Sequence, residues 1–93
     1  MILGTVEIRL SIRDARSLKD KRRVLASLKD CIRNKFNVSV AEIGDMDFVQ
    51  SATLGVAHVA NDSRYVNGTL DKLVGMVRTF PAAELVDYSI DIY

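Results

Sequence analysis

The segment from Ser17 to Phe36, SLKDKRRVLASLKDCIRNKF, constrains the fold of this chain more than any other. Its large apolar residues recur at helical spacing and form one seam: Leu18, Val24, Leu25, Leu28, Ile32 and Phe36. Ser17 is a suitable N-cap, and Asp20 three positions later completes a pair that satisfies free N–H groups at a helix start. We therefore predict an amphipathic helix whose seam the rest of the chain must cover, because burying each large apolar side chain contributes about 1.5–3 kcal/mol.

Basic residues line the flank of this seam. Between residues 13 and 35 lie nine of the chain's thirteen Lys and Arg residues but three of its twelve acids, a separation that the net charge of +1 conceals. We define the basic stripe by five side chains: Lys19, Arg22, Arg23, Lys29 and Arg33. Lys21 is predicted at the seam's edge, with its ammonium group reaching water. The stripe is either a solvated helix face or a docking surface for phosphates or an acidic protein.

The segments around this helix predict four strands and a second helix. Residues 2–12 alternate, with Ile2, Gly4, Val6, Ile8, Leu10 and Ile12 on one face and Thr5, Glu7, Arg9 and Ser11 on the other. Residues 38–43 and about 49–60 predict a hairpin around the turn residues 44–47. A second apolar seam at helical spacing consists of Val66, Leu70, Leu73 and Val77, and Phe80-Pro81 ends that helix.

The last strand is predicted at about residues 84–93. Its apolar face would hold Val86, Tyr88, Ile90 and Ile92, and its polar face Asp87, Ser89 and Asp91. The resulting order is βαββαβ. With right-handed crossovers, this order predicts a single α+β domain over residues 1–93: a ferredoxin-like sandwich with a four-stranded antiparallel sheet and two helices on one face.

Cysteine content and hydropathy indicate the cellular compartment of the protein. A single cysteine, Cys31, excludes an internal disulfide and a paired-cysteine metal or redox site, and we predict it as a small, half-buried hydrophobe. The chain has no leader-like segment and no apolar run near the ~20 residues that a membrane-spanning helix needs. We therefore expect a cytoplasmic protein with no membrane partner.

Three stretches of the chain resemble a known family. They are MILGTVEIRL at the start, ARSLKDKRRVLASLKDCIRNKFNVSVAE in the middle, which is the most specific, and DFVQSATLGVAHVANDSR after it. On these stretches the chain resembles the YlxP-like family of bacterial proteins, a family of unknown function. The resemblance implies a ferredoxin-like fold and a bacterial cytoplasmic protein, and it implies no catalytic residues. Genes of this family often lie among genes for translation and ribosome maturation.

Several chemistries known on this topology lack their residues here. RNA-recognition modules stack bases on aromatic residues of the open sheet face, which here is predicted to be small, polar and acidic, so any nucleic-acid contact would use the helices. Acylphosphatase-like enzymes need a glycine-bearing phosphate loop after the first strand, and residues 13–17 contain none. His58 is either a hydrogen-bonded side chain or a ligand or general base. We expect no enzyme activity, no catalytic residues, no metal and no cofactor.

Three functions remain open. The first is a binding module that contacts RNA or a ribosome-associated factor through the basic stripe. The second is a self-associating structural or protein-interaction domain, such as a homodimer, that uses the open sheet face or an edge strand. That surface would be formed by small residues: Ser39, Ala41, Ser51, Thr53, Gly55 and Ala57. The third is a small-metabolite-sensing module, for which the sequence offers no pocket residues.

Overall fold

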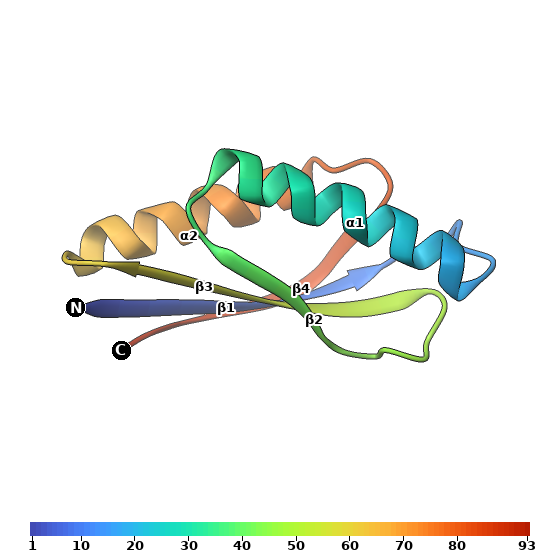
Figure 1. Ribbon diagram of the computed structural model, residues 1–93, viewed down its shortest axis with the longest axis horizontal. Coiled ribbons are helices and arrows are strands. Elements are labelled where there is room, and N and C mark those ends of the chain that lie inside the picture. Colours follow the sequence, from blue (N-terminus) through green and yellow to red (C-terminus); the bar gives the residue numbers. More distant parts are fainter.

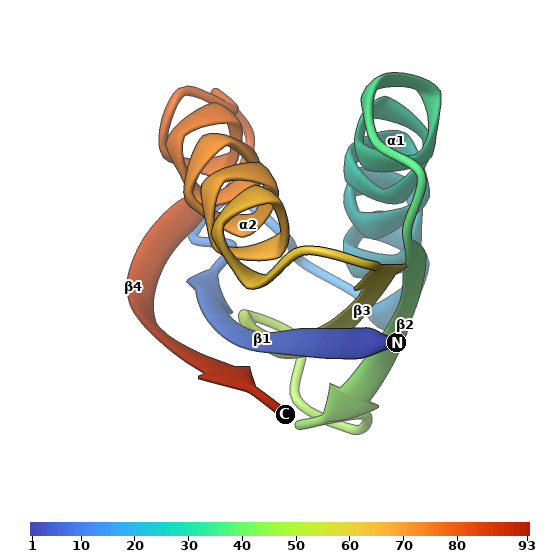
Figure 2. The same ribbon diagram turned by 90° about the vertical axis from the view of Figure 1, so that its left-hand side faces the viewer.

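The computed structural model describes all residues, 1–93. Its elements are β1 (Ile2–Ser11), α1 (Leu18–Lys35), β2 (Ser39–Gly44), β3 (Ser51–Ala60), α2 (Ser63–Arg78) and β4 (Glu84–Ile92). The strands form one antiparallel sheet in the order β2-β3-β1-β4, and both helices lie on the same face of it (Figure 1). Seen from its end in Figure 2, the sheet has one face under the helices and one bare face. The predicted ferredoxin-like α+β fold is confirmed.

The apolar patterns of the sequence place the core between the sheet and the helices. The inward residues Val6, Ile8 and Leu10 of β1 are buried, as are most residues of the two helix seams, and Ile2 is partly buried. Eighteen buried hydrophobic residues form one cluster, to which both helices and all strands except β4 contribute. β4 adds only the partly buried Leu85 and Ile90. Neither helix is long and apolar enough to cross a bilayer.

Helix α2 packs directly onto the backbone of β1 at Gly4. A Cβ at this position would overlap the Cγ1 methyl of Val66 and would lie 3.0 Å from Cδ1 of Leu70. Glycine therefore allows this close approach of a helix to a strand. The contact fixes the height of α2 above the sheet.

A β-bulge corrects one prediction for β4. Arg9 is opposite Asp87 and Leu10 is opposite Leu85, so that Val86 is an extra residue without a partner in β1. Leu85 packs against the core, whereas Val86 is 57% exposed. The prediction that Val86 faces inward is wrong because the bulge reverses the alternation at this point.

A second bulge lies in β2, between Glu42 and Gly44, where the register with β3 shifts. Ile43 is the extra residue, and its side chain covers Gly55 of β3 on the bare face of the sheet. Glu42 is opposite the buried Leu54 and therefore points toward the helices. The only charged side chain of β2 is therefore absent from the bare face, because Glu42 shares the orientation of Val40.

Two predictions for side chains of α1 are also wrong. Lys21 does not reach water but is 1% exposed, at the N-terminal end of the row of residues that α1 buries. Cys31, expected to be half-buried, lies on the exposed side of the helix. The apolar residues Leu25, Leu28 and Ile32 are buried as the seam predicts.

Candidate nucleic-acid interface

Positive and negative charges lie in different layers of the domain. The two helices contain ten basic and three acidic residues, whereas the four strands contain one basic and five acidic residues. Because both helices cover the same face of the sheet, this difference along the chain becomes a difference between two sides of the molecule (Figure 1). The helix layer is basic and the sheet layer is acidic.

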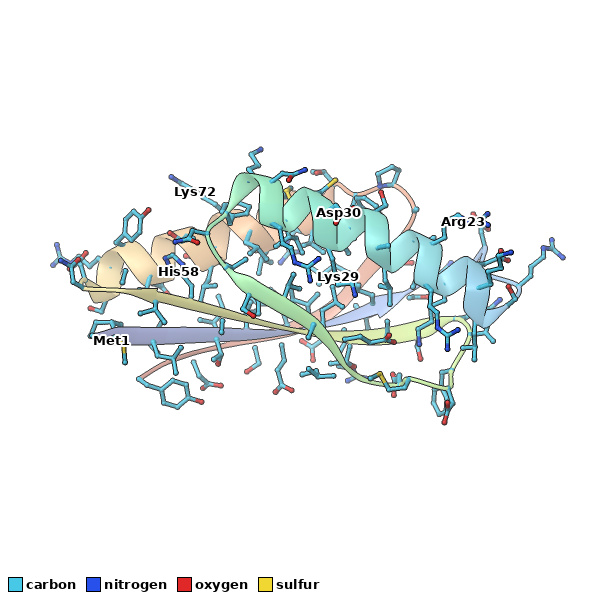
Figure 3. All side chains as sticks on the ribbon, in the orientation of Figure 1. Met1, Arg23, Lys29, Asp30, His58 and Lys72 are labelled. Atoms are coloured by element: carbon cyan, nitrogen blue, oxygen red, sulfur yellow. The ribbon has the colours of Figure 1, made fainter.

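The basic stripe divides into two parts in three dimensions. Lys19, Arg22 and Arg23 are exposed on the first two turns of α1, and none of them makes an ion pair. Lys29 is half-buried. In Figure 3, Arg23 points away from the sheet, whereas Lys29 reaches down toward β2. The structure therefore brings together three free cations near the start of α1.

Arg33, at the other end of the stripe, is already engaged. Its Nη2 donates a hydrogen bond to the carbonyl oxygen of Val40, at 3.1 Å. Its Nη1 lies 3.8 Å from Oδ1 of Asp30, in an exposed ion pair of the kind that contributes little to stability. Val40 belongs to the edge strand β2, so this arginine also occupies a backbone acceptor on the sheet edge.

Lys21 anchors the loop between β2 and β3 beneath the start of α1. Its Nζ donates to the carbonyl oxygens of Asp45 and Phe48, at 2.6 and 2.7 Å. It also lies 2.9 Å from Oε2 of Glu42, with which it forms an ion pair. A buried ammonium group that is saturated in this way holds the loop and helix together.

The bare sheet face brings together four of the six small residues predicted for self-association. Ser39, Ala41, Gly55 and Ala57 line a shallow hollow of about 390 Å³, whose wall also contains Ile43 and Tyr93. Ser51 lies apart, because its hydroxyl donates to Oδ2 of Asp45 at 3.1 Å. Thr53 packs against Gly44 at the bulge of β2.

His58 fits the hydrogen-bonded alternative. Its ring is 4% exposed, and Nδ1 lies 3.0 Å from the carbonyl oxygen of Asn37. The Tyr65 ring packs beside it, with 5.8 Å between the ring centroids, and Nε2 has no partner. No group of three or more His, Cys, Asp or Glu side chains in the molecule could hold a metal ion.

Sequence reasoning missed Phe48. This residue follows the turn residues 44–47 and was not part of any predicted pattern, yet its side chain is 62% exposed beside the start of α1. The available signal was an aromatic residue directly after a polar turn and outside the alternating part of the next strand. Nothing in the sequence places Phe48 near the arginines at residues 13–16.

Comparisons with known proteins agree on the family and on the fold. The family model described as "Protein of unknown function (DUF503)" matches residues 3–90. The chain is 36% identical over 83 residues to the uncharacterized protein YlxP of Bacillus subtilis (strain 168). The aligned region covers 89% of this chain and 90% of the relative. The de novo designed protein Foldit4 matches with a TM-score of 0.54 and 12% identity over 98% of this chain and 96% of its own, which is a likeness of fold alone. The chain thus belongs to the DUF503 family of proteins of unknown function.

Proposed function

We propose that this protein is a non-enzymatic binding module that contacts RNA or a ribonucleoprotein through the basic stripe on α1. The observation that carries the proposal is the separation of charge between the basic helix layer and the acidic sheet layer. A polyanion is attracted to the first layer and repelled by the second, so its approach is restricted to one side of the domain.

The exposure of the side chains in the basic stripe also supports this surface as the one that contacts RNA. Lys19, Arg22 and Arg23 are exposed and unpaired, so phosphate contacts there would displace no protein carboxylate. Lys29 and Arg33 lie farther along α1 and lean toward β2. The first three residues are therefore the primary phosphate contacts in this proposal, and Lys29 and Arg33 extend the surface.

The test is a pair of charge-matched double variants. Arg22→Glu/Arg23→Glu reverses two cations of the stripe, and Arg64→Glu/Lys72→Glu reverses two exposed, unpaired cations of α2. We expect the first variant to weaken binding to a labelled structured RNA on the order of tenfold or more, and the second to have a clearly smaller effect. Fluorescence anisotropy measures both affinities, and thermal unfolding confirms that both variants fold.

Other results would overturn the proposal. Equal losses in the two variants would mean that RNA is attracted by overall charge and not by the stripe. No binding by the parent protein at low salt would mean that the stripe is a solvated surface. Replacing Arg33 is less informative, because its loss also frees the Val40 carbonyl at the sheet edge.

A second candidate function, self-association through the bare sheet face, is favoured by one observation. The hollow at Ala41, Gly55 and Ala57 is bordered by Ile43 and Tyr93, which are 49% and 69% exposed. Large side chains beside a hollow of small residues suit a second copy related by a twofold axis, in which each copy fills the hollow of the other. The partner in this candidate is therefore another copy of the chain.

Charge and size determine how the two copies would meet. Pairing of two β2 edges is disfavoured, since Arg33 occupies the Val40 carbonyl and the edge strand lies beside the basic stripe. A typical stable interface buries about 800 Å² per partner, so the two copies would have to meet over the sheet face and not over one strand edge. Packing of the two sheet faces leaves both helix layers exposed.

A further inference from the structure

A hollow of about 620 Å³ lies at the start of α1, between the loop from β1 to α1 and the loop from β2 to β3. Its lining residues include Arg13, Arg16 and Phe48. This volume is within the range of known small-ligand sites, about 300–1,000 Å³. The hollow adjoins the exposed end of the basic stripe, because Arg16 is three residues from Lys19 along the chain.

Both walls of the hollow are fixed by hydrogen bonds that join the two loops. Nε2 of Gln50 donates to the carbonyl oxygens of Arg13 and Ala15, at 3.1 and 3.0 Å, and the Ile12 amide donates to the Gln50 carbonyl at 2.9 Å. The buried Lys21 holds the carbonyl of Phe48 on the opposite wall. The hollow therefore has its shape without a ligand, which lowers the entropy lost on binding.

Phe48 is the second observation at this site. Its side chain is 62% exposed and lies outside the hydrophobic core, so the fold gains little from an aromatic ring at this position. An exposed ring beside arginines matches the chemistry of an unpaired nucleotide, whose base stacks on aromatic side chains and whose phosphate accepts hydrogen bonds from guanidinium groups.

The charges around the hollow assign different roles to its residues. Arg16 makes no ion pair, so its guanidinium group is free for a phosphate. Nη2 of Arg13 lies 3.2 Å from Oε2 of Glu84 in an exposed ion pair. Such a pair is weak enough for the arginine to exchange the carboxylate for a phosphate. Asp14 also lines the hollow. A carboxylate repels phosphate but accepts a hydrogen bond from a ribose hydroxyl or a base amino group.

We propose that this hollow binds one unpaired nucleotide of an RNA strand, with the base stacked on Phe48 and the phosphate held by Arg16 and Arg13. This inference rests on the proposed function, since the same strand continues along Lys19, Arg22 and Arg23. The stripe supplies affinity for any phosphate backbone. The hollow adds a preference for single-stranded over fully paired RNA.

The experiment uses the absence of tryptophan from the chain. In the Phe48→Trp variant the only indole lies in the hollow, and we expect its fluorescence to be quenched by a single-stranded RNA without self-complementarity and not by a duplex. Phe48→Leu keeps an apolar side chain but has no aromatic face. We expect it to bind the single strand about 5- to 100-fold more weakly and the duplex with unchanged affinity.

Tyr65→Ala is the matched control, because Tyr65 is also 62% exposed but lies at the start of α2, with its ring beside His58. It should bind both RNAs like the parent protein. Unchanged single-strand affinity in Phe48→Leu, or unquenched fluorescence in Phe48→Trp, would overturn the nucleotide site. If Arg22→Glu/Arg23→Glu still abolished binding in that case, the proposed function would stand, whereas a parent protein that binds neither RNA would refute both.

Discussion

Nζ of Lys21 in α1 lies 2.9 Å from Oε2 of Glu42 in β2, in an ion pair whose side chains are 1% and 18% exposed. The same ammonium group donates hydrogen bonds to two carbonyl oxygens of the loop that follows β2. One lysine therefore connects the first helix, the edge strand and a loop that borders the hollow at the start of α1. These three contacts compensate for the loss of hydration of an ammonium group in an otherwise apolar surface.

We first predict that Lys21→Met destabilises the fold by about 3–5 kcal/mol, since it leaves the Glu42 carboxylate buried without its partner. Urea unfolding monitored by circular dichroism measures the loss. Lys21→Met/Glu42→Gln should recover part of it, because the buried charge is then gone. Lys19→Met, at an exposed position two residues away, should stay within about 0.5 kcal/mol of the parent. A Lys21→Met protein as stable as Lys19→Met would contradict the role given to this ammonium group.

The second prediction concerns the contact between α2 and β1. Gly4→Ala introduces a methyl group where Val66 and Leu70 leave no space, so α2 must move away from the sheet. We expect a loss of about 1–3 kcal/mol in the free energy of unfolding. Thermal or urea unfolding measures it, and the additional variant Gly4→Ala/Val66→Ala should restore part of the stability.

The third prediction is a gain in stability, and it concerns a glycine on the outer side of α2. A Cβ at Gly75 meets no atom within 4 Å. Gly75→Ala should therefore stabilise the protein by about 0.5–1 kcal/mol, because alanine restricts the unfolded chain and suits a helix interior. A destabilised Gly75→Ala protein, measured in the same unfolding assay, would indicate a contact that the monomer does not contain.

The fourth prediction follows from the charges of the stripe. With about three to five phosphate contacts, log Kd for structured RNA should change with log salt with a slope of about 2–4 in magnitude. Binding titrations over a range of salt concentrations give this slope, which should fall in Arg22→Glu/Arg23→Glu. Glu7→Gln, on the bare sheet face, should leave both the slope and the affinity unchanged. A salt-independent affinity would exclude phosphate contacts as its source.

The fifth prediction addresses self-association. Light scattering from micromolar to millimolar concentration should detect a dimer of the parent protein if the two bare sheet faces pack together. Ala57→Glu places a charge in the hollow at Ala41, Gly55 and Ala57 and should give a monomer, whereas Ser27→Glu, exposed on α1 in the helix layer, should not. A parent protein that remains monomeric over the whole range would rule out this candidate.

The spacing of apolar residues predicts the helices and strands correctly. It predicts the wrong orientation where a bulge interrupts the alternation of a strand. The alternation of β1 and the seams of both helices predicted the core, since each of these elements is regular over its whole length. Val86 was not placed correctly because it is the extra residue of a bulge. A bulge depends on the register with a neighbouring strand, which no window of a single sequence contains.

The candidate site was only partly predictable for a similar reason. The stripe could be found because its residues follow one another on a single helix. Lys21 could not be assigned, because its acceptors lie 21 to 27 residues later in the chain. Phe48 lines the same hollow as Arg13 and Arg16 only because two loops lie side by side in the fold. Sites assembled within one element are visible in a sequence, and sites assembled between loops require the folded structure.

The opposite charges of the helix and sheet layers give the domain an electric dipole directed across the sheet. In the field of a polyanion this dipole produces a torque, which turns the molecule before any side chain makes contact. Molecules would therefore arrive with α1 leading, and a larger share of collisions would be productive than shape alone allows. In the proposed complex the sheet side would face away from the polyanion, where a second protein could reach it without competing for the same cations.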